Sequence, residues 1–118
     1  MIVEDHADTR RTLAGLLSGI GHEISTADCK QTALESVESK HFDVILSDIN
    51  LPDGTGYDVI SQAKRTHALK GVAISGLDGS EDLRRSKEAG FDFHLIKPLD
   101  FADLCGILNG FDLQPALA

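Results

Sequence analysis

The feature that most constrains this chain is a regular alternation between short apolar runs and segments with helical periodicity. The apolar runs, which are typical of β-strands, are Met1–Val3, Glu23–Thr26 (the weakest), Val44–Leu46, Val72–Ile74 and Phe93–Ile96. After each run, apolar residues recur at the spacing of a helix, within positions 13–20, 33–37, 59–63, 83–89 and 104–108. The sequence therefore predicts a strand–helix unit that occurs five times in succession.

Strands that alternate with helices form a parallel sheet through right-handed crossovers, with helices on both faces. The central runs lack polar alternation, as expected of strands that are buried on both faces. In 118 residues, this order predicts a single α/β domain over positions 1–118. The predicted fold is a flavodoxin-like, doubly wound (βα)5 three-layer sandwich with the parallel strand order 2-1-3-4-5. An eight-unit barrel would need about twice this length.

Residues that favour helix ends and turns mark the borders of these units. Asp8 and Asp100 are predicted to cap the N-termini of the first and last helices, and Gly90 is predicted to end the fourth helix. The pair Asp53-Gly54 predicts a turn.

Charge and cysteine content exclude several kinds of partner. With 11 basic and 19 acidic residues, the chain has a net charge of −8, which repels phosphate backbones, so we expect no direct nucleic-acid partner. No apolar run approaches the roughly 20 residues that span a bilayer, and no secretory leader precedes the first strand. We therefore expect no membrane insertion and a cytoplasmic location. Cys29 and Cys105 are isolated and match no metal-binding spacing, which fits a reduced compartment.

Polar residues follow the apolar runs at the points where the strands should end. They are Glu4 and Asp5 after the first run, Asp48 after the third, Ser75 after the fourth, and Lys97 with Pro98 after the fifth. Ligands of open α/β sheets bind beyond the carboxyl ends of the strands. Because strands 1, 3, 4 and 5 are adjacent in the predicted order, we expect three carboxylates, one hydroxyl and one ammonium group to converge.

Such a cluster favours a hard metal ion and phosphoryl chemistry. Neighbouring carboxylates repel one another unless a cation holds them, and an all-oxygen set of ligands favours Mg²⁺ over Mn²⁺ or Ca²⁺. One carboxylate can then attack phosphorus, while the ion and Lys97 neutralise phosphoryl oxygens and Ser75 donates a hydrogen bond to one of them. Each residue alone is common as a cap, a turn residue or a surface lysine, so only the combination favours a site.

One further motif, Asp48-Ile49-Asn50-Leu51-Pro52-Asp53-Gly54, follows the third run. With the acidic pair, Ser75 and Lys97-Pro98, it makes essentially the whole chain resemble the receiver (response-regulator) domains of bacterial two-component phosphorelays. The resemblance implies that Asp48 takes a phosphoryl group from a histidine of a partner kinase or phosphotransfer domain. It also implies a phosphoacceptor rather than an enzyme, and we expect a monomer or a weak dimer.

The resemblance assigns roles residue by residue. It implies that Glu4 and Asp5 hold Mg²⁺, or alternatively Mn²⁺, together with Asp48 and the main-chain carbonyl of Asn50. It places Ser75 at the family's Ser/Thr switch position and Lys97 at its phosphate-contacting lysine, and the Lys97–Pro98 bond is often cis in such domains.

Two residues border this expected site, and a third belongs to its expected switch. Asn50 and Leu77 lie two residues beyond Asp48 and Ser75, and we expect them to influence water access. His94, three residues before the lysine, occupies a switch position that is usually Tyr or Phe. We expect the His94 ring to turn inward on phosphorylation and to repack the face formed by the fourth helix, the fifth strand and the fifth helix.

Features outside the site favour one setting for the domain. The family's first strand usually starts a few residues earlier, which predicts a first strand that is cut short here. Positions 90–100 resemble receivers fused at the C-terminal end of hybrid sensor histidine kinases. Positions 111–118 suggest no output domain, and the last helix lacks the basic residues of receivers that dimerise to join DNA-binding domains. We therefore favour a hybrid-kinase receiver, with a stand-alone response regulator as the alternative.

Other classes of function remain open at this point. A phosphatase of the haloacid dehalogenase type also uses a strand-end Asp and Mg²⁺, but it needs a second Asp where this chain has Asn50. A flavodoxin-like cofactor binder needs a phosphate loop rich in Ser, Thr or Gly after the first strand, where this chain has Glu4-Asp5-His6-Ala7-Asp8. An α/β interaction module without phosphoryl chemistry is the plainest alternative.

Overall fold

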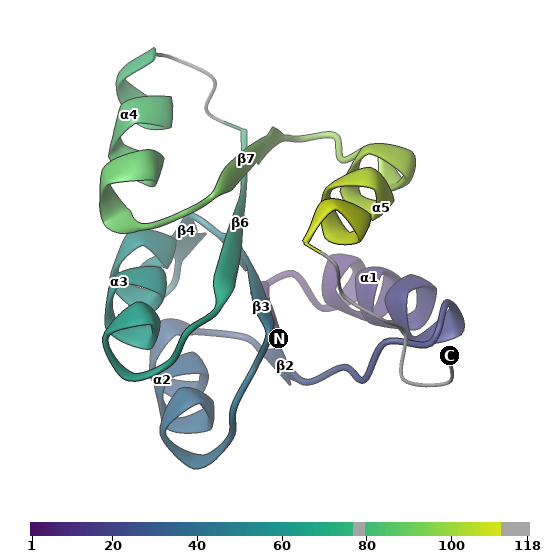
Figure 1. Ribbon diagram of the computed structural model, residues 1–118, viewed down its shortest axis with the longest axis horizontal. Helices are drawn as coiled ribbons and strands as arrows, with labels where there is room; N and C mark the ends of the chain where they lie inside the picture. Colours follow the sequence, from purple (N-terminus) through teal and green to yellow (C-terminus); the bar gives the residue numbers. More distant parts are fainter. Residues whose placement is uncertain (77–79, 112–118) are drawn as a thin grey trace.

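The computed structural model describes residues 1–76 and 80–111 of the chain (Figure 1). In chain order, its elements are β1 (Ile2–Val3), α1 (Ala7–Gly19), β2 (Thr26–Ala27), α2 (Lys30–Ser39), β3 (Val44–Asp48), β4 (Asn50–Leu51), β5 (Gly54–Thr55), α3 (Gly56–Thr66), β6 (Lys70–Ser75), α4 (Ser80–Ala89), β7 (Phe93–Ile96) and α5 (Phe101–Gly110). The predicted site-bordering residue Leu77 lies outside the described residues.

Five strands form a parallel sheet in the order β2-β1-β3-β6-β7. This order confirms the predicted fold class and topology, because β6 and β7 are the fourth and fifth strands of the sheet along the chain. β3 lies at the centre, where Leu46 pairs with Ile2 of β1 and with Val72 of β6. Because the strands are parallel, their carboxyl ends meet at one edge of the sheet.

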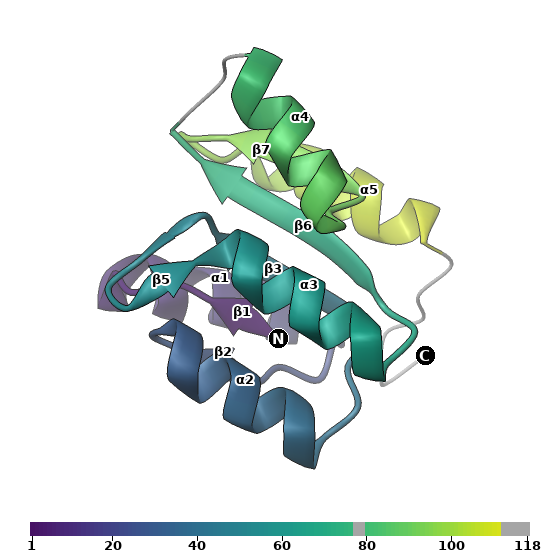
Figure 2. The same cartoon turned by 90° about the vertical axis from the view of Figure 1, so that its left-hand side faces the viewer.

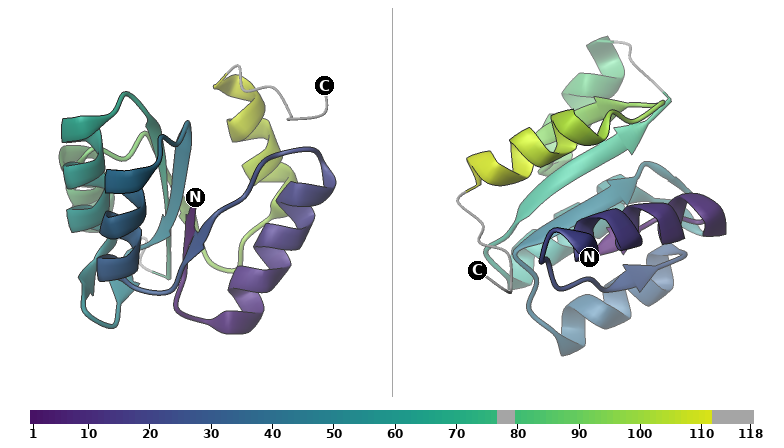
Figure 3. Two further views of the ribbon diagram at one scale, coloured as in Figure 1. Left: turned by 90° about the horizontal axis from the view of Figure 1, so that it is seen from below. Right: turned by 90° about the vertical axis from the view of Figure 1, so that its right-hand side faces the viewer.

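Helices cover both faces of the sheet and make the predicted three-layer sandwich. Helices α1 and α5 lie on one face, and α2, α3 and α4 lie on the other (Figure 1 and Figure 3). Successive residues of the central strand enter different cores, since Ile45 packs with residues of α2 and α3 and Leu46 packs with residues of α1 and α5. Burial on both faces explains why the central runs are continuously apolar.

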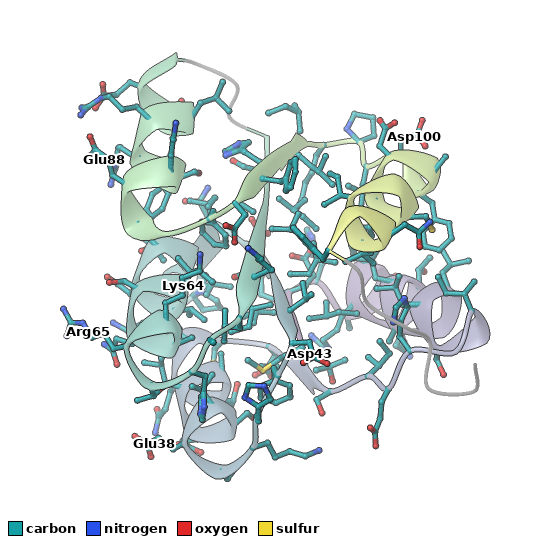
Figure 4. The ribbon with its side chains drawn as sticks, viewed as in Figure 1. Glu38, Asp43, Lys64, Arg65, Glu88 and Asp100 are labelled. Atoms are coloured by element: carbon teal, nitrogen blue, oxygen red, sulfur yellow. The ribbon has the colours of Figure 1, made fainter. Side chains whose placement is uncertain are left out.

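Local chemistry sets the ends of the last three helices. The Thr55 hydroxyl caps α3 by accepting the N–H of Asp58 at 3.3 Å, and Lys64 and Arg65 occupy the last turn of that helix (Figure 4). Gly90 follows α4 with a φ of 122°, in the left-handed region that favours glycine, as predicted. Asp100 caps α5 as predicted, and its carboxylate accepts the N–H of Ala102 at 2.8 Å (Figure 4).

The predicted start of α1 is wrong. The helix begins at Ala7 instead of after Asp8, because the carbonyl of His6 already accepts the N–H of Arg10 at 2.9 Å. Asp8 therefore lies in the first turn, where its carboxylate pairs with Arg11 at 2.6 Å.

Two strand predictions also change. The weak strand expected over Glu23–Thr26 is β2 at Thr26–Ala27, and β1, which it pairs with, contributes only two residues to the pairing. The turn predicted at Asp53-Gly54 belongs to a small antiparallel hairpin of β4 and β5, which the sequence analysis did not predict (Figure 2). This hairpin joins the end of β3 to the start of α3.

Glycine at the start of α3 is required by the closeness of β3. The N–H of Gly56 donates to the Ile49 carbonyl at 2.8 Å, and a Cβ at Gly56 would collide with the carbonyl oxygen of Asp48. Since Asp48 belongs to a buried central strand, its backbone has little room to move. We expect Gly56→Ala to lower the free energy of unfolding by about 1–3 kcal/mol in urea titrations.

A matched control is Gly15→Ala. No atom of the described residues lies within 4 Å of a Cβ built at this exposed position inside α1. The same substitution there should raise the free energy of unfolding by about 0.5–1 kcal/mol, because alanine favours a helix over glycine. Equal effects of the two substitutions would show that the contact with Asp48 does not require glycine.

Candidate functional site

The carboxyl edge of the sheet gathers the predicted polar residues. Glu4 follows β1, Asp48 ends β3, Ser75 ends β6 and Lys97 follows β7. Because these four strands are neighbours, Glu4, Asp48 and Lys97 come into direct contact although they lie far apart in the sequence. The neighbouring strand end carries Ser75, which is buried.

Three carboxylates form the acidic part of the cluster. One oxygen each from Glu4, Asp5 and Asp48 lies within 4.8 Å of the others. Glu4 and Asp48 are buried, whereas Asp5 is exposed to solvent. An all-oxygen set with one open side fits a hard divalent cation such as Mg²⁺, which keeps several of its water ligands.

Among the described residues, Lys97 supplies the positive charge that contacts these carboxylates. Its ammonium group donates to Asp48 Oδ2 at 3.0 Å and lies 3.5 Å from Glu4 Oε1. A hydrogen bond fixes the backbone of Lys97, because its main-chain N–H donates to the carbonyl of Ser75 at 2.8 Å. The Lys97–Pro98 peptide bond is cis, as the resemblance implies.

The pKa values of Glu4 and Lys97 show that negative charge exceeds positive charge in this cluster. Burial, followed by the hydrogen bond and the negative charge of Asp48, raises the pKa of Glu4 from 4.5 to about 7. Burial alone would lower the pKa of Lys97, but Asp48 and Glu4 outweigh it and raise that pKa overall. One ammonium group therefore does not fully compensate the buried carboxylates.

Asn50 and His94 occupy different parts of the site region. The main-chain N–H of Asn50 donates to Asp48 Oδ1 at 3.4 Å, and the side chain of Asn50 is exposed. His94 is half-buried on β7, where its Nδ1 shares a hydrogen bond of 2.7 Å with the hydroxyl of Ser86 in α4. The structure thus places Asn50 against Asp48 and ties His94 to α4.

Sequence reasoning missed Arg10. Its guanidinium donates to the main-chain carbonyls of Glu4 at 2.9 Å and Asp5 at 3.4 Å, which fixes the backbone of the acidic loop. Nothing in the sequence distinguishes this half-buried arginine from the neighbouring Arg11, which pairs with Asp8 on the surface.

Comparison with known proteins now decides the family. The profile of the response regulator receiver domain matches residues 1–109. The chain belongs to this family. Receiver domains are phosphoacceptor signalling domains with an acidic, Mg²⁺-binding pocket, and the family match does not favour the phosphatase alternative.

Individual relatives agree with this assignment. The chain is similar to the sensor histidine kinase RcsC of Escherichia coli K12, with 35% identity over 102 residues, which cover 84% of this chain and 10% of that protein. It is also similar to the KDP operon transcriptional regulatory protein KdpE of the same organism, with 31% identity over 88% of this chain and 46% of that protein. This receiver domain therefore spans about a tenth of the length of RcsC.

A solved structure shows the same fold. The receiver domain protein (CheY-like) of Methanospirillum hungatei JF-1 superposes with a TM-score of 0.87 and 27% identity, over 94% of this chain and 90% of that one. Within residues 1–76 and 80–111, the receiver domain has no helix that is both long and apolar enough to cross a membrane.

The raised pKa of Glu4 predicts a pH-dependent stability of the metal-free domain. The folded state binds this proton more tightly than the unfolded state, so the stabilisation is complete below pH 4.5 and is lost as the pH rises through about 7. In urea titrations with EDTA, Glu4→Gln should remove the loss of stability between pH 4.5 and about pH 8. At about pH 8 it should raise the free energy of unfolding by roughly 1–3 kcal/mol relative to the wild type.

The control for charge alone is Glu38→Gln. Glu38 is exposed at the far end of α2 and points into solvent (Figure 4). Its substitution should leave the pH dependence of the unfolding free energy unchanged. If Glu4→Gln and Glu38→Gln gave the same pH profile, the proton of Glu4 would have no part in the stability.

Proposed function

We propose that this receiver domain accepts a phosphoryl group on Asp48 from a phosphohistidine of a partner kinase or phosphotransfer domain. The observation that carries the proposal is the placement of Asp48 at a strand end, within 3.0 Å of Lys97 and beside two further carboxylates. Glu4, Asp5, Asp48 and the main-chain carbonyl of Asn50 would hold Mg²⁺, and Mn²⁺ is a possible substitute with the same kind of ligands.

The transfer follows from the contacts of Asp48. A carboxylate oxygen of Asp48 attacks phosphorus, a P–O bond forms, and the P–N bond to the donor histidine breaks. The electron pair of that bond stays on the imidazole nitrogen, which takes up a proton. Lys97, which already donates to Asp48 Oδ2, moves its hydrogen bond to a phosphoryl oxygen. Mg²⁺ supplies, when bound, the positive charge that neutralises phosphoryl oxygens.

The signal passes to the face formed by α4, β7 and α5. Ser75 lies at the end of β6, where it pairs with Ile96 of β7, and we propose that its hydroxyl responds to a phosphoryl group on Asp48. We place His94 in the same switch, because its hydrogen bond to Ser86 links β7 to α4. Phe93 and Ile96, with exposed fractions of 46% and 38%, offer apolar surface on this face.

Similarity to RcsC favours a setting within a hybrid sensor histidine kinase, and a stand-alone response regulator is the alternative. In either setting we propose that the domain works in the cytoplasm as a monomer or weak dimer, without contacting nucleic acid. The net charge of −8 supports the last point, because it opposes contact with phosphate backbones.

Mass spectrometry tests the acceptor and the metal together. With acetyl phosphate and Mg²⁺, the domain should gain one phosphoryl mass, and Asp48→Asn should abolish the gain because an amide is a poor nucleophile. EDTA should also abolish the gain. Asp43→Asn, at the opposite end of β3, should leave labelling unchanged (Figure 4). Full labelling of Asp48→Asn would show that another residue is the acceptor.

Nuclear magnetic resonance tests the switch. Fluoroberyllate, a phosphoryl mimic, should shift the ring resonances of His94 in the wild-type domain and leave them in place in Asp48→Asn. His67 is the internal control, because it ends α3 and its Nε2 bonds to the Val37 carbonyl at 2.9 Å, away from the carboxyl edge. A His94 ring that does not respond to the mimic would not belong to the switch.

A further inference from the structure

Helix α2 begins on a carboxylate supplied by another part of the chain. Its N-cap residue, Cys29, makes no side-chain capping bond within the described residues. Instead, Asp53 accepts the N–H of Lys30 at 2.7 Å and the N–H of Gln31 at 2.9 Å. These two bonds do what an N-cap side chain normally does, but from a residue more than twenty positions further along the chain.

Asp53 lies in the turn of the β4–β5 hairpin, which begins two residues after Asp48. Hydrogen bonds from the main-chain N–H groups of Gln31 and Lys30 lower the pKa of Asp53. The turn contains only Pro52 and Asp53, so the position of Asp53 is closely tied to that of the paired strands.

A second set of contacts holds the same hairpin against α2. The ammonium group of Lys30 lies 3.4 Å from Asp58 Oδ2 in the first turn of α3. The aliphatic part of Lys30 covers Gly54 so closely that a Cβ there would meet Lys30 Cδ at 2.5 Å. The start of α2 therefore holds the hairpin both at its turn and along β5 (Figure 2).

The segment that carries Glu4, just after β1, also contacts the connection between β2 and α2. The N–H of Glu4 donates to the carbonyl of Ala27 at 3.0 Å, and Ala27 ends β2 just before α2 begins. The connection between β2 and α2, together with the start of α2, thus contacts both the segment that carries Glu4 and the hairpin that follows Asp48. A displacement at this connection would change how the two segments face each other.

We propose that Asp53 is a positioning residue of the phosphoacceptor site, which acts by anchoring the hairpin that begins at Asn50 to the start of α2. A two-stranded hairpin of this size is marginal by itself and needs an external contact to hold one position. Asn50 pairs with Thr55 across the hairpin, so the anchor at Asp53 fixes the main chain of Asn50 relative to Asp48. The proposal rests on the proposed function in one respect, the use of the Asn50 carbonyl by the metal ion.

The test compares Asp53→Ala, Asp53→Asn and Asp43→Ala in the isotope-labelled domain. Amide hydrogen exchange is measured first, without metal. Asp53→Ala should speed exchange about fivefold at Lys30 and Gln31, and should also speed it at Asn50 and Leu51, because both ends of the anchor are released. Asp53→Asn should give intermediate exchange rates at Lys30 and Gln31, because its single amide oxygen replaces only one of the two carboxylate oxygens that accept these N–H groups.

Titration with Mg²⁺, followed by amide chemical shifts, gives the second readout. Asp53→Ala should raise the Kd for Mg²⁺ about threefold to tenfold if loss of the anchor costs as much as loss of a helix cap. Asp53→Asn removes the same charge as Asp53→Ala but keeps one of the two acceptor oxygens, so its Kd should lie between those of the wild type and Asp53→Ala, which separates positioning from electrostatics. Asp43→Ala, at the amino end of β3, controls for loss of a surface carboxylate.

Two outcomes would overturn the proposal. Faster exchange at Lys30 and Gln31 alone, with an unchanged Kd for Mg²⁺, would make Asp53 a helix cap and nothing more. Equal weakening by Asp53→Asn and Asp53→Ala would assign the effect to charge. A wild-type domain that does not respond to Mg²⁺ would count against the proposed metal site instead. The exchange rates at Asn50 and Leu51 would still decide whether Asp53 anchors the hairpin.

Discussion

Glu4, Asp5 and Asp48 place carboxylate oxygens within 4.8 Å of one another, and Lys97 is the ammonium group that contacts two of them. Like charges at this separation oppose folding, and the pKa of Glu4, raised by burial and by Asp48, records that opposition. The rest of the fold has to hold these groups together against their repulsion. The same imbalance fits the cluster for a divalent cation, and under the proposed function the charge of that cation would also offset the charge of a phosphoryl group.

The scaffold meets this demand with a rigid sheet and with polar contacts to the loops. β3 and β6 are buried from both sides, so Asp48 ends a strand whose position is fixed by two hydrophobic cores. Arg10 holds the carbonyls of the acidic loop, and Asp53 ties the loop after Asp48 to α2. The groups that would do the chemistry are therefore held by neighbours that do not take part in it.

The face formed by α4, β7 and α5 is the part of the molecule through which we propose that the signal leaves the domain. Similar sequences occur in a sensor histidine kinase and in a transcriptional regulatory protein, although the chain covers very different shares of the two proteins. Under the proposed function, one kind of phosphoacceptor edge could serve proteins of both kinds if the surfaces that respond to it differ. In this chain, the hydrogen bond between His94 and Ser86 joins β7 to α4 on that face.

The sequence alone determined the strand order and the identity of the residues at the strand ends. Continuously apolar runs such as Val72–Ile74 indicate strands that are buried on both faces of a sheet. Parallel strands bring their carboxyl ends to one edge of the sheet regardless of the conformation of the loops. It did not determine the start of α1, the β4–β5 hairpin, or the roles of Arg10 and Asp53. Those depend on hydrogen bonds to groups that are distant in the chain or that belong to the main chain, as between Asp53 and the amides of Lys30 and Gln31. Residue type and spacing do not encode such contacts, because they exist only once the sheet has brought the partners together.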